Sequence, residues 1–125
     1  MRGRIEIYLP ILKKLGVVYY KAHRKVGFHF DNMAMWLLCE NTNTDISKFE
    51  EKFSGRQDVF IAEMIFAAYC SWCMVRRKKQ KYTKEQILKS FSNTTDSQRE
   101  SILKTWKRSE TFGVNENEKK KAVNQ

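Results

Sequence analysis

The chain has 125 residues, the length of one domain, which argues against a two-domain enzyme with a cleft between its domains. Its 42% hydrophobic and 13% aromatic content exceeds that of disordered chains, and its 30% charged residues argue against a protein with several membrane spans. The net charge of +10 favours acidic or polyanionic partners, and the low number of glycines (five) and prolines (one) favours helices over a strand-rich fold.

Charge alternates along the chain. Residues 1–30 carry seven bases and one acid, residues 31–58 carry three bases and six acids, and residues 76–81 hold five bases. Two basic zones that flank an acidic one can direct head-to-tail contact between copies or can hold nucleic acid, and the pattern leaves both open. Three cysteines cannot all pair within the chain and the N-terminus shows no secretory signal pattern, so we expect a reducing, cytoplasmic setting.

The first thirty residues predict a β-rich segment. Residues 4–9 alternate polar and apolar side chains and end at Pro10, which suits a short strand, although the apolar spacing also fits a helix. Residues 17–20 are β-branched and aromatic, and residues 26–30 alternate again after the polar stretch 21–25. The simplest prediction is a short hairpin between 17–20 and 26–30.

Helix signals follow. Asp31 is a good N-cap and predicts a helix from about 32 to 41, and Asp45 can cap a second, short helix that stops at Ser54-Gly55. Residues 59–75 are apolar on nearly every face, which is typical of a buried central helix, and their basic continuation suits the negative end of a helix dipole. Two capping boxes predict two further helices: Thr83 with Gln86, and Thr95 with Gln98.

The predicted fold class is mainly α, a single domain over residues 1–113. We expect a compact bundle of about four to five helices around a buried central helix (about 58–79), with a short N-terminal β-hairpin within the β-rich segment (about 4–30). The run 115–121, Asn-Glu-Asn-Glu-Lys-Lys-Lys, contains no large apolar side chain, and residues 114–125 are predicted to form a mobile charged tail. The predicted core consists of large apolar and aromatic side chains: Trp36, Phe60, Met64, Phe66, Tyr69, Trp72, Ile102 and Trp106.

No catalytic, cofactor-binding or metal-binding residue is predicted. Cys70 and Cys73 have the C-x-x-C spacing, but both lie late in a helix among large apolar residues, where buried, unreactive thiols are the better interpretation. A zinc site would need two more ligands at a paired spacing. His29 should face away from its two phenylalanine neighbours, yet no nucleophile motif accompanies it, so an enzyme is disfavoured.

The apolar run 59–75, followed by bases, also imitates a membrane span. Glu63, Ser71 and the minimal length count against that reading, and we expect no membrane partner.

The strongest polar signal is the basic cluster that follows the central helix. It could contact a polyanion or an acidic partner, and the alternative is a solvated helix end. Its bases are Arg76, Arg77, Lys78, Lys79 and Lys81.

The order of several short segments resembles the tail assembly chaperones of long-tailed bacteriophages, over about residues 26–113. The similarity lies in the pattern of helix lengths and apolar positions. The segments that carry it are Gly27-Phe28-His29-Phe30, Ala34-Met35-Trp36-Leu37-Leu38-Cys39-Glu40, Asp45-Ile46-Ser47-Lys48-Phe49, Ile65-Phe66-Ala67-Ala68-Tyr69, Tyr82-Thr83-Lys84-Glu85-Gln86-Ile87, and Trp106 with Ser109 before Gly113.

The resemblance implies a non-enzymatic, mainly helical protein without a cofactor. Such a protein would bind the tape-measure protein, recruit tail-tube subunits, self-associate and act in the cytoplasm of a bacterial host. Two alternatives stay open, a basic nucleic-acid-binding protein and a structural component of the virion. A chaperone needs an exposed apolar groove, a nucleic-acid binder needs bases that converge on one face, and a structural protein needs large complementary interfaces.

Overall fold

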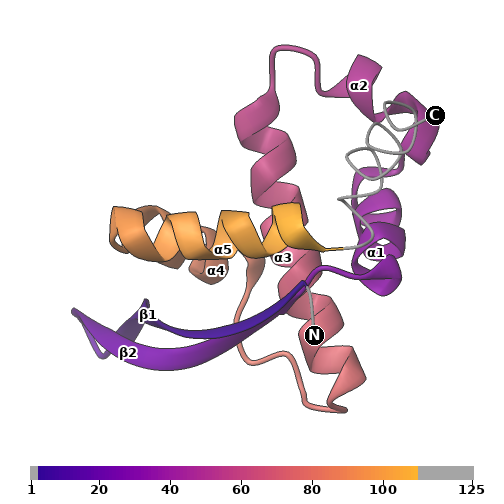
Figure 1. Cartoon of the computed structure of the whole chain (residues 1–125). Coiled ribbons are helices and arrows are strands. Elements are labelled where there is room, and N and C mark those ends of the chain that lie inside the picture. The colour runs from indigo at the N-terminus through magenta and orange to yellow at the C-terminus, as the bar shows by residue number, and fades with distance from the viewer. Residues whose placement is uncertain (1–2, 110–125) are drawn as a thin grey trace.

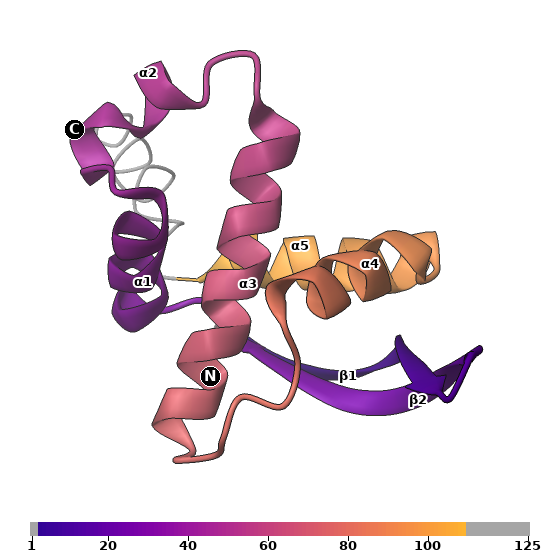
Figure 2. The same ribbon diagram turned by 180° about the vertical axis from the view of Figure 1, so that it is seen from behind.

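A computed structural model describes residues 3–109 and is shown in Figure 1. Helix α3 stands upright in the middle, with α1 and α2 on one side and α4 and α5 on the other, while the hairpin crosses the C-terminal part of α3. Figure 2 shows the same arrangement from behind. The elements are β1 (Arg4–Leu15), β2 (Val18–His29), α1 (Asn32–Thr42), a 3-10 turn η1 (Ile46–Lys48), α2 (Phe49–Lys52), α3 (Gln57–Val75), α4 (Lys84–Asn93) and α5 (Asp96–Arg108).

The two strands form one long antiparallel hairpin. They pair from Arg4 opposite His29 to Leu15 opposite Val18, and Gly16 occupies the turn with a positive φ of 63°. A positive φ at the first turn position is what a type II′ turn requires, and glycine adopts it without steric strain. The predicted hairpin between 17–20 and 26–30 is therefore wrong, because residues 18–29 form a single strand.

Two sequence features that predicted strand ends, Pro10 and the polar stretch 21–25, lie inside strands. Pro10 is in β1, opposite His23, and residues 21–25 are in β2. Both strands of a two-stranded sheet are edge strands, where a residue without an N–H is tolerated and polar side chains can face water. The face toward the helices is apolar and includes Leu9, Ile11, Val26 and Phe28, all buried.

Helix α1 begins at the predicted cap, since the Asp31 carboxylate accepts a hydrogen bond of 2.8 Å from the Ala34 amide. Ala34 and Leu38, one turn apart, are fully buried on the side that packs against α3. Trp36 lies on another side of the helix and is 55% exposed. The prediction that Trp36 belongs to the core is wrong, because the inward stripe of α1 is Ala34–Leu38.

Helix α3 ends earlier than predicted. Arg77 adopts a left-handed φ of 53°, and the amides of Arg77 and Lys78 donate to the carbonyls of Met74 and Cys73 at 3.1 and 2.9 Å. This pair of bonds is a Schellman motif, which terminates a helix by satisfying its last carbonyls. The basic cluster therefore follows the helix as an exposed connection to α4, and the predicted extension to about residue 79 is wrong.

The last two helices start at their predicted caps. Thr83 and Gln86 form the complete capping box of α4, with both reciprocal bonds present. Thr95 accepts from the Gln98 amide at the start of α5, but the Gln98 side chain does not return to the cap. It donates instead to the carbonyl of Tyr8 at 2.8 Å and so ties α5 to β1.

The predicted fold class is wrong, because the protein has a compact α+β fold. Of the described residues, 56% are helical and 22% lie in the two strands. The hairpin is part of the core and packs against α3, α4 and α5. The predicted tail, 114–125, lies outside the described residues.

The core surrounds the middle of α3. Four predicted core residues are buried and three are half-buried against the same cluster. The buried ones are Met64, Tyr69, Trp72 and Ile102, and the half-buried ones are Phe60, Phe66 and Trp106. Both ends of α3 are exposed, including Val59 and Val75, so the helix is not buried all round as its composition suggested.

Candidate functional site

An apolar groove opens between α3, α4 and α5. Its volume is about 520 Å³, and its apolar side chains are half-buried, so they line a floor that solvent reaches. The rim is polar and mainly acidic. We call it the α3–α4–α5 groove; its lining residues are Ile61, Ala62, Leu88, Phe91 and Leu103 on the floor, and Asp58, Ser92, Asp96, Arg99 and Glu100 around it.

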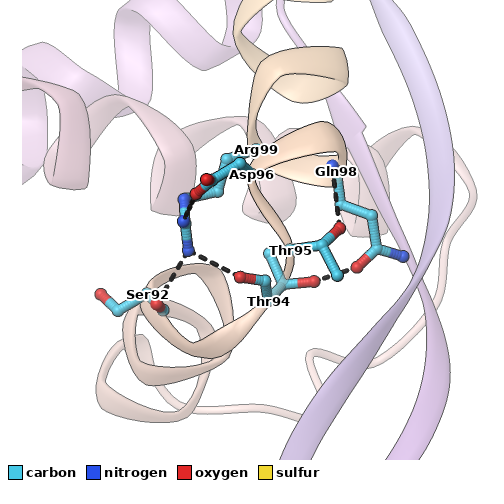
Figure 3. Close-up of polar contacts among 6 residues, drawn as sticks. All are labelled: Ser92, Thr94, Thr95, Asp96, Gln98 and Arg99. Carbon is cyan, nitrogen blue, oxygen red and sulfur yellow. Dashed lines mark hydrogen bonds and ion pairs between the residues drawn. The ribbon is translucent and has the colours of Figure 1, made fainter.

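Arg99, beside the groove, joins the end of α4 to α5. Its guanidinium donates to the carbonyls of Ser92 and Thr94 at 2.9 and 2.7 Å, and it also pairs with Asp96 (Figure 3). These carbonyls belong to the end of α4, where a helix leaves its last carbonyls without partners. A charged donor there stabilises the helix end and joins it to α5.

The charges on the groove's rim do not cancel. Arg99 is paired with Asp96, whereas Asp58 and Glu100 form no ion pair with any residue in the described range 3–109. Because these two carboxylates flank an apolar floor, the groove is suited to an apolar surface bordered by bases.

Most of the predicted basic cluster converges on a second, smaller pocket. Arg76, Lys78, Lys79 and Lys81 line a pocket of about 170 Å³ together with Lys25 from β2, and Arg77 is not among its lining residues. Figure 2 shows the connection between α3 and α4 passing beside the hairpin. The structure therefore brings four of the five predicted contact residues next to a base from the other basic zone.

Trp72 forms part of the wall of this pocket and packs against Gly27. A Cβ atom at Gly27 would lie 2.0 Å from the Trp72 ring, so only glycine fits under the indole. The Arg76 guanidinium covers the same ring at 4.0 Å from its centroid and lies 3.6 Å from Glu6. Lys25 also pairs with Glu6, at 3.1 Å.

The two cysteines of the C-x-x-C motif are buried and poor nucleophiles. Burial in the first place, and Cys73 nearby in the second, raise the pKa of Cys70 to about 11. Burial also raises the pKa of Cys73. A redox-active pair needs a lowered thiol pKa and access to solvent, so this geometry favours a packing role.

A cluster of serine, aspartate and histidine joins β2, α1 and α3. The Asp31 carboxylate accepts from the Ser71 hydroxyl at 2.7 Å and lies 3.4 Å from Nδ1 of His29. A catalytic triad has the histidine between the other two groups, whereas here the carboxylate is central and the serine is fully buried. The arrangement anchors the start of α1 to α3, and the His29 side chain, expected to face solvent or a partner, is largely buried.

Within residues 3–109, no group of three or more His, Cys, Asp or Glu side chains is placed to hold a metal ion. Helix α3 is long and apolar enough to cross a membrane by length and composition, with a mean hydropathy of 1.5 over its best window, of which 50% is buried in the protein. The core helix of a soluble protein passes the same test, so this finding alone does not assign α3 to a membrane.

No protein-family model matches the chain, and no curated protein and no solved structure matches it either.

Two parts of these sites were missed by reasoning from the sequence. The groove is missed because its floor comes from three helices whose apolar residues, among them Ile61, Leu88 and Leu103, all look like core. The contribution of Lys25 is missed because the hairpin was misplaced. The available signal was the period of two in Lys21, His23 and Lys25, which fits one face of a continuous strand.

Proposed function

We propose that the protein is a non-enzymatic assembly adaptor that binds an amphipathic helix of a partner protein. The α3–α4–α5 groove carries this proposal, because it keeps an apolar floor open to solvent beside a closed core. The resemblance to tail assembly chaperones over about residues 26–113 supports a finer version. In that version the client is the tape-measure protein of a long-tailed bacteriophage, and the adaptor recruits tail-tube subunits in the host cytoplasm.

The size of the groove suits helix-in-groove recognition. Its volume of about 520 Å³ can accept a few large apolar side chains. An amphipathic helix presents such side chains on one face at i, i+3, i+4 and i+7. The unpaired carboxylates of Asp58 and Glu100 favour a partner helix with bases beside its apolar stripe.

Self-association belongs to the same proposal. The hairpin tip exposes large apolar side chains that no described element covers, including Leu15, Val17 and Val18. Exposed apolar clusters of this kind typically mark contact with another protein chain. A second copy is the partner we propose for the tip.

The groove is tested with a synthetic helical peptide that has leucines at i, i+3, i+4 and i+7 and lysines beside them. Leu88→Gln and Leu103→Gln each place an amide in the apolar floor while keeping side chains that favour helix. Because burial of a leucine contributes about 1.5–3 kcal/mol, each variant should bind the peptide roughly tenfold more weakly or worse. The measurement is fluorescence anisotropy of the labelled peptide.

The matched control is Ile46→Gln, which changes an exposed apolar residue outside the groove. It should leave peptide affinity unchanged. Equal affinity of the wild-type protein and both groove variants would show that the peptide binds elsewhere or not at all, and the proposal would fail.

A further inference from the structure

The hairpin has a second face, opposite the one that packs on α4 and α5. The register places alternate residues of both strands on it, and the pairs Tyr8–Lys25 and Lys14–Tyr19 stand directly opposite each other. The ion pair of Glu6 with Lys25 and the position of the Lys14 ammonium 5.7 Å from the Tyr19 ring agree with this placement. Along the open part of this face lie Tyr8, Lys14, Tyr19, Lys21, His23 and Lys25.

Along β2 this face carries Tyr19, Lys21, His23 and Lys25 in succession, all of them exposed, whereas on β1 the buried Pro10 and the half-buried Leu12 separate Tyr8 from Lys14. Tyr8 is 59% and Tyr19 61% exposed, and each has a lysine as its cross-strand partner. Apolar rings that remain exposed on a folded surface are available for a flat partner to stack on. Successive side chains on one face of a strand are about 7 Å apart, so rings and charges follow one another along a line.

The connection between α3 and α4 continues this line with further bases. Its pocket, described above, contains Lys25, so the hairpin face and the connection share a wall. Lys78, Lys79 and Lys81 form no ion pair within the described residues, and Glu6, the one acidic residue of this pocket, is already shared by Lys25 and Arg76. No acidic side chain in the described range 3–109 therefore neutralises these three lysines.

The connection is held in place by hydrogen bonds. The Tyr69 hydroxyl accepts from the amides of Lys81 and Tyr82 at 3.0 and 3.1 Å, and the Schellman motif fixes the first residues after α3. Bases on a held backbone lose less conformational freedom on binding than bases on a flexible segment. This distinguishes the cluster from a merely solvated helix end.

We infer that this surface, the hairpin face together with residues 78–81, is a binding site for single-stranded nucleic acid. Unpaired nucleobases stack on the rings of Tyr8 and Tyr19. The lysines of the hairpin neutralise the phosphates that link these nucleobases, and the pocket beside Trp72 receives one further phosphate. Stacking on aromatic side chains combined with a basic track is the general mode of single-strand binding without sequence preference.

Single-stranded nucleic acid fits these observations better than an acidic protein segment does. The exposed basic side chains along this surface are mainly lysines, which bind phosphates as point charges, and the exposed tyrosine rings add a surface on which nucleobases stack. An acidic peptide would leave the exposed tyrosine rings unused. A duplex would hide its bases from those rings, so the site should prefer unpaired strands.

The site is tested by the anisotropy of a fluorescein-labelled oligothymidylate of about 15 nucleotides, at about 50 and about 200 mM salt. Replacing Lys78, Lys79 and Lys81 together by Gln should weaken binding at least about tenfold and lower the slope of log Kd against log salt by about 2. Tyr8→Thr with Tyr19→Thr should also weaken binding about tenfold, but with the salt slope unchanged.

The control variant removes three positive charges at a site remote from the proposed surface. Lys48, Lys52 and Arg56 lie around α2, at the other end of the molecule from the hairpin (Figure 1), and their replacement by Gln gives the same net charge. This variant should keep most of the affinity. Circular dichroism of every variant checks that the fold is retained.

Absence of binding at low salt, or equal losses in the two triple-Gln variants, would overturn the inference. Binding of poly-glutamate as tight as that of the oligothymidylate would also overturn it and assign the face to an acidic protein. Preference for duplex over single strand would exclude stacking on the tyrosines. The α3–α4–α5 groove is not part of this surface, so the peptide experiment is independent of this result.

Discussion

At the scale of single residues, the thiol of Cys70, which is buried within α3, makes the stability of the fold depend on pH. Its side chain lies 3.4 Å from the Oε1 atom of Gln80 in the connection that follows α3. Its pKa of about 11 in the folded protein stands above the ordinary value of 9.0 that we assign to the unfolded chain. The folded state therefore holds this proton more tightly than the unfolded state does.

We predict that Cys70 contributes stability at neutral pH that disappears in alkali. Because the folded-state pKa is the raised one, the contribution is complete below about pH 9 and is lost as the pH rises toward about 11. The free energy of unfolding of the wild-type protein relative to Cys70→Ala should fall by roughly 2 kcal/mol over this range. Chemical denaturation of both proteins at several pH values measures the difference, and a difference independent of pH would contradict the burial of this thiol.

At the scale of elements, the contact of the hairpin with α3 depends on the absence of a side chain at Gly27. Gly27→Ala would place a Cβ atom inside the Trp72 ring, so the strand or the helix must move. We predict a loss of about 1–3 kcal/mol in the free energy of unfolding, the usual range for overpacking. Urea denaturation measures it.

A double-mutant cycle identifies the cause of that loss. Trp72→Leu removes the ring atoms that the new methyl group would meet. Gly27→Ala should therefore destabilise the Trp72→Leu background much less than the wild-type background. Equal losses in both backgrounds would mean that Gly27 is required by its own strand and not by the helix.

The elements differ in how far the sequence allowed their prediction. The starts of α1, α4 and α5 were predicted correctly, because a capping side chain acts on amides within three residues of itself. The end of α3 was not predicted correctly. The residue in the left-handed conformation after the helix is Arg77, whereas a glycine at that position would have indicated a helix end. The hairpin was misplaced because Pro10 signals a break only where a strand is paired on both sides.

Tertiary contacts decided the remaining differences. Met33 with Trp36 and Ala34 with Leu38 are both at helical spacing, and only packing against α3 selects the second pair. The candidate sites illustrate the same limit. The basic cluster was visible in the sequence, but its meeting with Lys25 depends on the register of the hairpin, which composition does not encode.

At the scale of the whole molecule, the two proposed surfaces have opposite character. The α3–α4–α5 groove is apolar with an acidic rim, and the hairpin face with residues 78–81 is aromatic and basic. A chain with a net charge of +10 therefore has one surface suited to a basic amphipathic helix and another suited to a polyanion. This division is what we expect of an adaptor that joins different components.

The central claim is that a partner helix lies in the α3–α4–α5 groove. It is tested most directly by nuclear magnetic resonance of the ¹⁵N-labelled protein during titration with the leucine and lysine peptide. We predict saturable shifts of the amides of Ile61, Leu88 and Leu103, with the amide of Trp36 on α1 unchanged. No saturable shift at these three positions, or larger shifts around Trp36, would contradict the claim.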